Sequence, residues 1–174
     1  LLAPCHSATV RRWKARLDKC FTISDLQMLF ERRIPPVVGD YFLGGASEER
    51  TMQENVDAFQ RTHFAPNYGI KFDEIDLTTT VAGTDISMPI IAGPIGSLRT
   101  VWPRGEEVAA KATGDAGTIC TLSTLTGTRL EEVKAASAHD CWFQLYLVGG
   151  KEAATRGIER ARAAGYSALV LTID

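Results

Sequence analysis

A repeat of short apolar runs, separated by Ala- and Glu-rich segments, fills residues 77–174 and constrains the fold more than any other feature. The apolar runs start near Ile90, Ile119, Trp142 and Ala168. The segments between them have a helical composition and span residues 105–116, 128–138 and 151–164. Strands that alternate with helices at this spacing form βα units with parallel strands. The sequence therefore predicts an α/β fold.

Near-continuous apolar strands are buried on both faces, as in a closed barrel or in a doubly wound sheet. No Gly-x-Gly-x-x-Gly follows any of the runs, which disfavours a dinucleotide-binding sheet. Four βα units amount to about half of a (β/α)8 TIM barrel of ~250 residues, and four strands alone would leave open edges. We therefore expect the first half of a TIM barrel. The C-terminal half of the barrel would come from the rest of the same protein or from a nicked chain.

Residues 1–76 lack this repeat and are predicted to form a helical extension before the barrel. Ser24 followed by Gln27 fits a capping box, which predicts that a helix begins there. A short helix is expected over residues 36–43, because Gly44 and Gly45 follow it as a stop. Ser47 is expected to cap a third helix.

Two further segments have distinct patterns. Residues 76–87 alternate apolar and polar side chains around Ala-Gly-Thr-Asp, which predicts a small hairpin at the bottom of the barrel. Residues 1–20 are rich in Arg and Lys, and a solvated basic helix is the preferred interpretation. A helix that docks on a neighbour and part of a targeting segment stay open as alternatives.

The composition is that of an ordinary globular domain, with 45% hydrophobic and 23% charged residues. The net charge of −2 offers no basic surface, so no nucleic-acid partner is expected. No apolar run reaches the ~18 residues of a membrane-spanning helix. No cysteine pair has the spacing of a zinc site, so no metal is expected. Cys120 and Cys141 lie in apolar runs and are predicted to be buried free thiols, which fits a cytoplasmic location.

Function in a parallel barrel gathers at the carboxyl ends of the strands. Here these ends hold small or hydrogen-bonding residues, in the segments 92–96, 121–124, 144–146 and 172–174. Their side chains offer donors and acceptors but almost no charge, which suits a neutral, planar, heteroatom-rich ring better than a metal or a phosphate. Gly93 and Gly96 would let such a ligand approach the backbone. None of the three histidines lies at a strand end, so no imidazole base is in sight.

Five sets of motifs follow one another in unbroken order between about Thr22 and Asp174. They are Asp40-Tyr41-Phe42 with Gly44-Gly45-Ala46, Ser87-Met88-Pro89-Ile90 with Gly93-Pro94-Ile95-Gly96, Leu122-Ser123-Thr124, Trp142-Phe143-Gln144-Leu145-Tyr146, and Leu169-Val170-Leu171-Thr172-Ile173-Asp174. Together they resemble the FMN-dependent 2-hydroxy-acid dehydrogenase and oxidase family, which includes glycolate oxidase, L-lactate dehydrogenase and (S)-mandelate dehydrogenase. Each motif is weak alone, whereas the ordered set is specific.

The resemblance implies an FMN cofactor and the oxidation of a small L-2-hydroxy acid, lactate- or mandelate-like, to the 2-oxo acid. The residues that it places beside the flavin are Pro94, Ile95 and Gly96. Those that it implies to hydrogen-bond the flavin ring are Ser123, Gln144 and Thr172. As catalytic residues, facing the substrate carboxylate and hydroxyl, it implies Tyr41 and Tyr146. Ile95 departs from the Thr that is usual in relatives.

Two residues favour the dehydrogenase branch of the family. The oxidases tend to carry Ala where this chain has Gly96, and Trp where it has Leu125. The absent Trp would open the pocket to a larger substrate side chain. The resemblance also implies that Gly96 biases the enzyme away from oxygen and toward another acceptor, such as a quinone.

The resemblance further implies what this segment lacks. The family's histidine base, substrate-binding arginines and flavin-charge lysine lie after Asp174, so the segment alone is not expected to be catalytically competent. A homotetramer is implied, as is peripheral contact with the inner face of the membrane through the loop after Asp174. Two alternatives stay open: a non-catalytic half-barrel that acts as an interaction module, and another FMN-barrel enzyme such as an isomerase.

Overall fold

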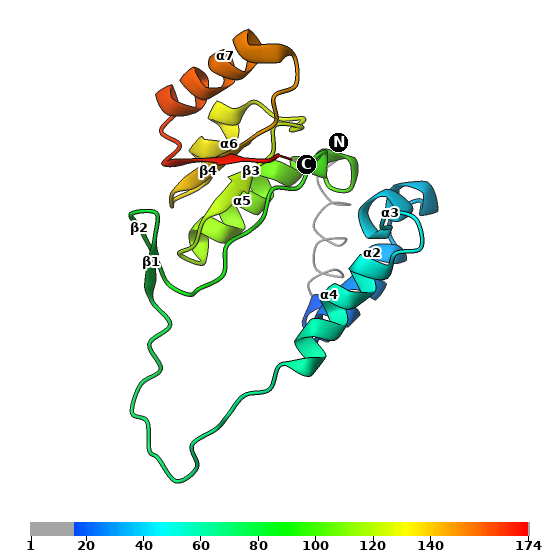
Figure 1. Cartoon of the computed structure of the whole chain (residues 1–174), viewed down its shortest axis with the longest axis vertical. Helices are drawn as coiled ribbons and strands as arrows, with labels where there is room; N and C mark the ends of the chain where they lie inside the picture. Colours follow the sequence, from blue (N-terminus) through cyan, green and yellow to red (C-terminus); the bar gives the residue numbers. More distant parts are fainter. Residues whose placement is uncertain (1–15, 174) are drawn as a thin grey trace, which may run out of the picture. The chain divides into compact units, whose positions relative to one another are not determined.

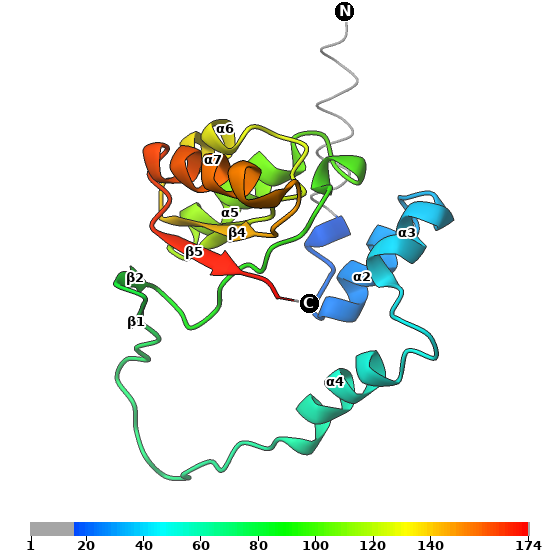
Figure 2. The same ribbon diagram turned by 45° about the horizontal axis from the view of Figure 1, so that its top comes forward.

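The computed structural model describes residues 16–173, and these form two units that divide after Pro66 (Figures 1 and 2). The basic helix expected within residues 1–20 therefore lies mostly outside the described residues. The domain boundary expected after residue 76 stays a prediction. Each unit is described by itself below.

Between residues 20 and 66, the first unit holds three helices. They are α2 (Ile23–Glu31), α3 (Pro36–Leu43) and α4 (Arg50–Arg61). The bounds of α3 confirm the helix expected over residues 36–43. The capping box expected at Ser24 is wrong, because Thr22 and Asp25 already make one: the Thr22 hydroxyl accepts from Asp25 N at 3.1 Å, and the Asp25 carboxylate accepts from Thr22 N at 2.9 Å. The capping box thus forms two residues earlier than expected and satisfies the N–H groups of Thr22 and Asp25.

The expected cap of the third helix is also wrong. Ser47 precedes α4 with a φ of 53°, and the residue at the cap is Glu49, with a φ of 56°. The Glu49 carboxylate turns back to accept a 2.9 Å hydrogen bond from Gly45 N, so it closes the turn before the helix instead of capping the first helical N–H groups.

The hairpin expected within residues 76–87 is confirmed in the second unit. Strands β1 (Thr79–Val81) and β2 (Thr84–Ile86) pair antiparallel, with Thr79 opposite Ile86. The two turn residues, Ala82 and Gly83, have φ values of 49° and 80°. Two consecutive positive φ angles are the signature of the tight turn whose twist matches that of paired strands.

A parallel three-stranded sheet forms the body of the second unit. Its strands are β3 (Cys120–Leu122), β4 (Cys141–Leu145) and β5 (Ala168–Leu171), adjacent in chain order. The connecting helices are α5 (Gly105–Asp115), α6 (Leu130–Ala136) and α7 (Gly150–Ala163). This βα alternation confirms the α/β class. Gly117 and Gly165 follow α5 and α7 with positive φ, as expected of helix stops.

The strand expected near Ile90 does not form within the described residues. Only an isolated parallel bridge joins Ala92 to Cys120, so three of the four expected strands are present and no barrel is closed. Pro89 and Pro94 flank this segment, and a proline cannot donate to a strand ladder. The bridge nevertheless sets this segment alongside the start of β3, and Gly96 then lies next to Ser123, just after the carboxyl end of β3.

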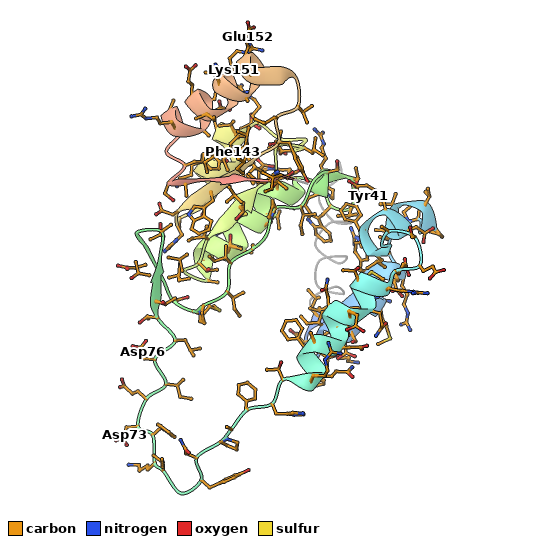
Figure 3. The ribbon with its side chains drawn as sticks, in the orientation of Figure 1. Tyr41, Asp73, Asp76, Phe143, Lys151 and Glu152 are labelled. Carbon is orange, nitrogen blue, oxygen red and sulfur yellow. The ribbon has the colours of Figure 1, made fainter. Side chains whose placement is uncertain are left out.

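The core lies between one face of the sheet and the three helices. Alternate residues of β3 and β4, among them Leu122, Cys141 and Phe143, pack with Val133 of α6 and Ala154 of α7. Figure 3 labels Phe143 within this layer. The intervening residues of each strand face the opposite side, which brings their polar side chains together at the strand ends.

The two cysteines of this core are buried and unpaired, which confirms the prediction of free thiols. Cys120 and Cys141 lie opposite each other on neighbouring strands. Burial raises the pKa of both thiols, that of Cys120 to about 11, so they behave as small apolar side chains at neutral pH.

Candidate functional site

The side chain of Gln144 links the carboxyl ends of all three strands. It is only 1% exposed. Its Nε2 donates to Oγ1 of Thr172 at 2.8 Å, just after β5, and its Oε1 accepts from Thr124 N at 3.0 Å, just after β3. The Thr124 hydroxyl donates to the Gln144 carbonyl at 2.5 Å and accepts from Tyr146 N at 3.0 Å. The expected site residues Gln144, Thr172 and Tyr146 are therefore brought together.

Ser123 and Gly96 lie side by side at the next position along this edge. The Ser123 hydroxyl, 4% exposed, accepts a 3.1 Å hydrogen bond from Leu125 N. A Cβ added at Gly96 would lie 3.8 Å from that hydroxyl and 3.3 Å from the Leu125 Cβ. Ser97 N donates to the Leu125 carbonyl at 3.0 Å. The segment after Ala92 and the segment after β3 thus form one wall of the site.

The polar side chains at the strand ends still have hydrogens that they can donate to a ligand. Among residues 16–173, the hydroxyls of Ser123 and Thr172 accept hydrogen bonds and donate none. The Gln144 amide uses one of its two Nε2 hydrogens. The edge therefore presents uncharged donors to a ligand that carries acceptors. The carbonyl oxygens and ring nitrogens of a flavin are acceptors of this kind. At Gly96 the packing is so close that a Cβ would fill the remaining space. These residues therefore fit an FMN ring.

The remaining predicted residues have different surroundings. Pro94 and Ile95 are exposed, and a Cβ at neighbouring Gly93 would meet nothing within 4 Å, so this backbone is open to a ligand. Tyr146 is half-buried. Tyr41 lies on α3 of the first unit, where its ring is 67% exposed and stands edge-on to Phe42 at 5.0 Å (Figure 3).

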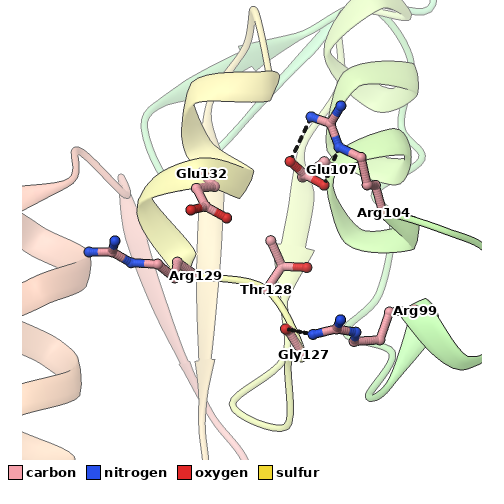
Figure 4. A pocket seen from close by; sticks show the side chains of 7 residues that line it. All are labelled: Arg99, Arg104, Glu107, Gly127, Thr128, Arg129 and Glu132. Carbon is pink, nitrogen blue, oxygen red and sulfur yellow. Dashed lines mark hydrogen bonds and ion pairs between the residues drawn. The ribbon is translucent and has the colours of Figure 1, made fainter.

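A buried carboxyl group behind this wall escaped the sequence analysis. Glu106, the second residue of α5, is 1% exposed. Its Oε1 accepts from Gly127 N at 3.2 Å and its Oε2 from the Thr128 hydroxyl at 3.1 Å. Arg99 Nη1 donates to the Gly127 carbonyl (Figure 4). In the sequence, an acidic residue at a helix N-terminus indicates only a favourable interaction with the helix dipole. No sequence pattern therefore predicted this contact.

A cavity of about 310 Å³ opens next to this contact, between η1 (Leu98–Thr100), the start of α5 and the start of α6. Its lining residues are Arg99, Arg104, Glu107, Gly127, Thr128, Arg129 and Glu132. Arg104 forms a two-pronged ion pair with Glu107, with both N–O distances at 2.8 Å (Figure 4). The hydrogen bonds from Arg104 lower the pKa of the Glu107 carboxyl. The two charges thus neutralise each other within the cavity wall.

Two classes of site are not found among the described residues. No group of three or more His, Cys, Asp or Glu side chains in this part of the chain is arranged to hold a metal ion. No helix between residues 16 and 173 has the length and apolarity needed to cross a bilayer.

Comparison with known proteins identifies relatives. The model of the FMN-dependent dehydrogenase family matches residues 30–174. Glycolate oxidase 1 of Zea mays is 38% identical over 152 residues, which cover 87% of this chain and 41% of that protein. The chain therefore spans less than half the length of this relative.

Solved structures show the same resemblance in three dimensions. A soluble mutant of the membrane-associated (S)-mandelate dehydrogenase from Pseudomonas putida superposes with a TM-score of 0.85 at 35% identity, over 90% of this chain and 44% of that one. A mandelate oxidase with (S)-4-hydroxymandelic acid gives a TM-score of 0.85 at 28% identity, over 89% of this chain and 43% of that one.

Proposed function

The chain belongs to the FMN-dependent dehydrogenase family, and from this premise we propose that the complete protein oxidises an L-2-hydroxy acid, lactate- or mandelate-like, to the 2-oxo acid. The observation that carries the proposal is the row of uncharged donors at the strand ends, with Gln144 tied to Thr172 and Ser123 beside Gly96. Similarity to a glycolate oxidase and to (S)-mandelate dehydrogenase supports 2-hydroxy acids as the substrate class.

FMN supplies the two-electron redox chemistry, and the protein supplies binding, orientation and electrostatics. Ser123, Gln144 and Thr172 would hold the ring edge through the hydrogens that they keep free. The backbone of residues 94–96, of which Pro94 and Ile95 are exposed, would lie against the ring, since no side chain at Gly96 stands in the way. Gln144 is fixed from both sides before any ligand arrives, so little ordering is needed on binding.

Tyr41 and Tyr146 would act on the substrate side. A phenol donates a hydrogen bond to a carboxylate and orients a hydroxyl without competing as a base. The histidine base, the arginines and the flavin-charge lysine would come from sequence beyond this chain. General acid–base catalysis contributes about 10²–10⁴-fold, so we expect residues 1–174 alone to be inactive even with FMN added.

The partners follow from the same proposal. The C-terminal half of the barrel would pair with the open sheet, and the complete protein would assemble as a homotetramer. A cytoplasmic enzyme that contacts the inner face of the membrane through the loop after Asp174 fits the similarity to a membrane-associated mandelate dehydrogenase. That loop lies outside the described residues.

The test is the colour of the purified complete protein and its response to substrate. It should be yellow, and its flavin absorbance should bleach anaerobically with L-lactate or (S)-mandelate but not with the D or (R) enantiomers. A colourless protein, or a flavin that no 2-hydroxy acid reduces, would contradict the proposal. A complete protein without a His-Gly-Arg-like segment after residue 174 would instead favour the interaction module.

A further inference from the structure

The loop after β3 is held from behind by the segment that leads into α5. We call this set of contacts the loop clamp: it comprises Arg99 and Glu106 on one side and residues 125–128 on the other. Glu106 accepts hydrogen bonds from Gly127 N and the Thr128 hydroxyl, and Arg99 donates to the Gly127 carbonyl. Ser97 N adds a fourth contact, to the Leu125 carbonyl. The two loops are therefore joined by several hydrogen bonds, of which Figure 4 shows the one between Arg99 and Gly127.

The clamp reaches the strand-end site through Leu125. The N–H of Leu125 donates to the Ser123 hydroxyl, which fixes the direction in which that hydroxyl can donate its own hydrogen. The Cβ of Leu125 also borders the narrow place at Gly96, at 3.3 Å from where a Cβ would be. A shift of residues 125–128 would therefore turn the Ser123 hydroxyl and change the gap beside Gly96.

Glu106 is the most deeply buried member of the clamp. Its side chain is almost fully buried, and it extends from the first turn of α5, where the helix dipole favours a carboxyl group. Arg99 is exposed and makes one hydrogen bond to the loop, whereas Glu106 makes two. Glu106 thus transfers the fixed position of α5 to the loop.

We propose that Glu106 is a positioning residue for the cofactor site: its buried carboxyl group sets the place of residues 125–128 and, through them, of the Ser123 hydroxyl. The proposal rests on the proposed function, because the affected ligand is FMN. Glu106 itself lies behind the loop, and its two hydrogen bonds go to Gly127 and Thr128. Its loss should change how the flavin is held, beyond any loss of stability.

The experiment uses the complete protein and three variants. Glu106→Ala removes both acceptors, and Glu106→Gln keeps an oxygen for Gly127 N. Thr84→Val is the matched control, because Thr84 is likewise buried and its hydroxyl makes a 2.8 Å hydrogen bond, to Asp140, at the opposite end of the strands. The measurements are the dissociation constant of FMN, the visible absorption bands of bound FMN and the hydrogen exchange of residues 123–128.

Glu106→Ala should weaken FMN binding roughly 5- to 150-fold, the fold-change that corresponds to the cost of leaving a buried polar group unpaired. It should also shift the flavin bands and speed exchange in residues 123–128. Glu106→Gln should restore most of each, and Thr84→Val should lower the melting temperature alone. Unchanged FMN affinity and loop exchange in Glu106→Ala, or equal effects from Thr84→Val, would overturn the proposal.

Two outcomes need separate readouts. If Glu106→Ala does not fold, Thr128→Val removes one of the two donors and leaves the carboxyl group in place. The Thr128→Val variant should then weaken FMN binding a few-fold. An unchanged FMN affinity would count against the clamp. If the wild-type protein binds no FMN, the proposed function fails. Hydrogen exchange of residues 123–128 still decides whether Glu106 positions the loop.

Discussion

Thr172 Oγ1 accepts a 2.8 Å hydrogen bond from Gln144 Nε2, although the two residues are 28 positions apart in the sequence. The bond crosses from the end of β4 to the residue that follows β5. Together with the bond from Thr124 N to Gln144 Oε1, it fixes the amide before any ligand binds. A site arranged in this way loses little conformational entropy on binding a rigid ring.

Replacing Gln144 should therefore affect both stability and cofactor binding. Gln144→Leu leaves Thr124 N and the Thr172 hydroxyl without their partner. We expect a loss of about 1–3 kcal/mol in the free energy of unfolding, since an unpaired buried polar group costs about that much. FMN affinity should fall as well. Urea unfolding and FMN titration of the complete protein measure the two effects.

The matched control is Gln53→Leu on α4. Gln53 also donates a 2.9 Å side-chain hydrogen bond, to Asp57, but Gln53 itself is exposed. We expect a change within about 0.5 kcal/mol there, as for most surface substitutions. Equal losses at the two positions would show that burial at the strand ends is not what makes Gln144 important.

Because the thiol of Cys120 is buried, we expect the protein to lose stability at alkaline pH. Burial, and then the neighbouring Cys141, raise the pKa of the Cys120 thiol to about 11, from about 8.5 when unfolded. The folded state therefore holds its proton more tightly, and the stabilisation is complete below the unfolded pKa and is lost as pH rises through 11. The free energy of unfolding should fall by about 1–3 kcal/mol between pH 8.5 and 11.

Urea midpoints of the complete protein across this range measure the fall, and Cys120→Ala should make it smaller. The comparison with the variant is needed because burial also raises the pKa of the nearby Tyr166 hydroxyl, which acts with the same sign at higher pH. A pH dependence identical in the two proteins would mean that Cys120 does not contribute.

A side chain at Gly114 should clash where α5 meets the segment after α6. A Cβ at Gly114 would lie 2.6 Å from the Ser137 hydroxyl and 2.9 Å from the Ala138 backbone nitrogen. Because backbone has to move, we expect Gly114→Ala to destabilise the protein by about 1–3 kcal/mol. Gly157→Ala on α7 is the control: its Cβ would meet Phe143 at an ordinary 3.7 Å, so the helix should gain about 0.5–1 kcal/mol. Thermal unfolding of both variants checks the contrast.

Local patterns in the sequence predicted most of the second unit. Apolar runs marked β3, β4 and β5, and a composition rich in Ala and Glu marked the helices between them. The first expected strand failed because Pro89 and Pro94 weaken hydrogen bonding to a neighbour, a cost that an apolar pattern does not register. The capping box failed for a related reason, since Thr22 and Asp25 already form one two residues earlier.

The sequence predicted that several candidate residues share one edge of the sheet, but not how these residues bond to one another. Ser123, Gln144 and Thr172 were found because parallel strands end at a common edge. Glu106 was missed because its partners, Gly127 and Thr128, are 21 and 22 residues away and carry no pattern that identifies them. Contacts between loops depend on the packing of the elements that carry them, which no local signal contains.

The last prediction concerns Gly96 and the electron acceptor that reoxidises the flavin. We propose that a Gly at this position disfavours reaction of the reduced flavin with oxygen, because the resemblance to the family associates Ala here with oxidases. The structure adds the reason that a methyl group would be felt: a Cβ at Gly96 would lie 3.3 Å from the Leu125 Cβ and 3.6 Å from its carbonyl. The Cβ of Leu125 is fixed to the backbone, so the loop itself has to move by a few tenths of an ångström.

Gly96→Ala in the complete protein should therefore speed the reoxidation of reduced FMN by oxygen, measured by stopped flow, and slow transfer to a quinone. Gly157→Ala on α7 is the control, because its Cβ would make only an ordinary contact, with Phe143 at 3.7 Å. A further variant separates packing from chemistry: Leu125→Gly removes the contacting Cβ, so combining it with Gly96→Ala should reverse any change that comes from displacement of the loop. If Gly96→Ala reduces stability but leaves the rate of FMN reoxidation by oxygen unchanged or lower, Gly96 does not determine the electron acceptor. The glycine would then be required only for the close packing of the loop.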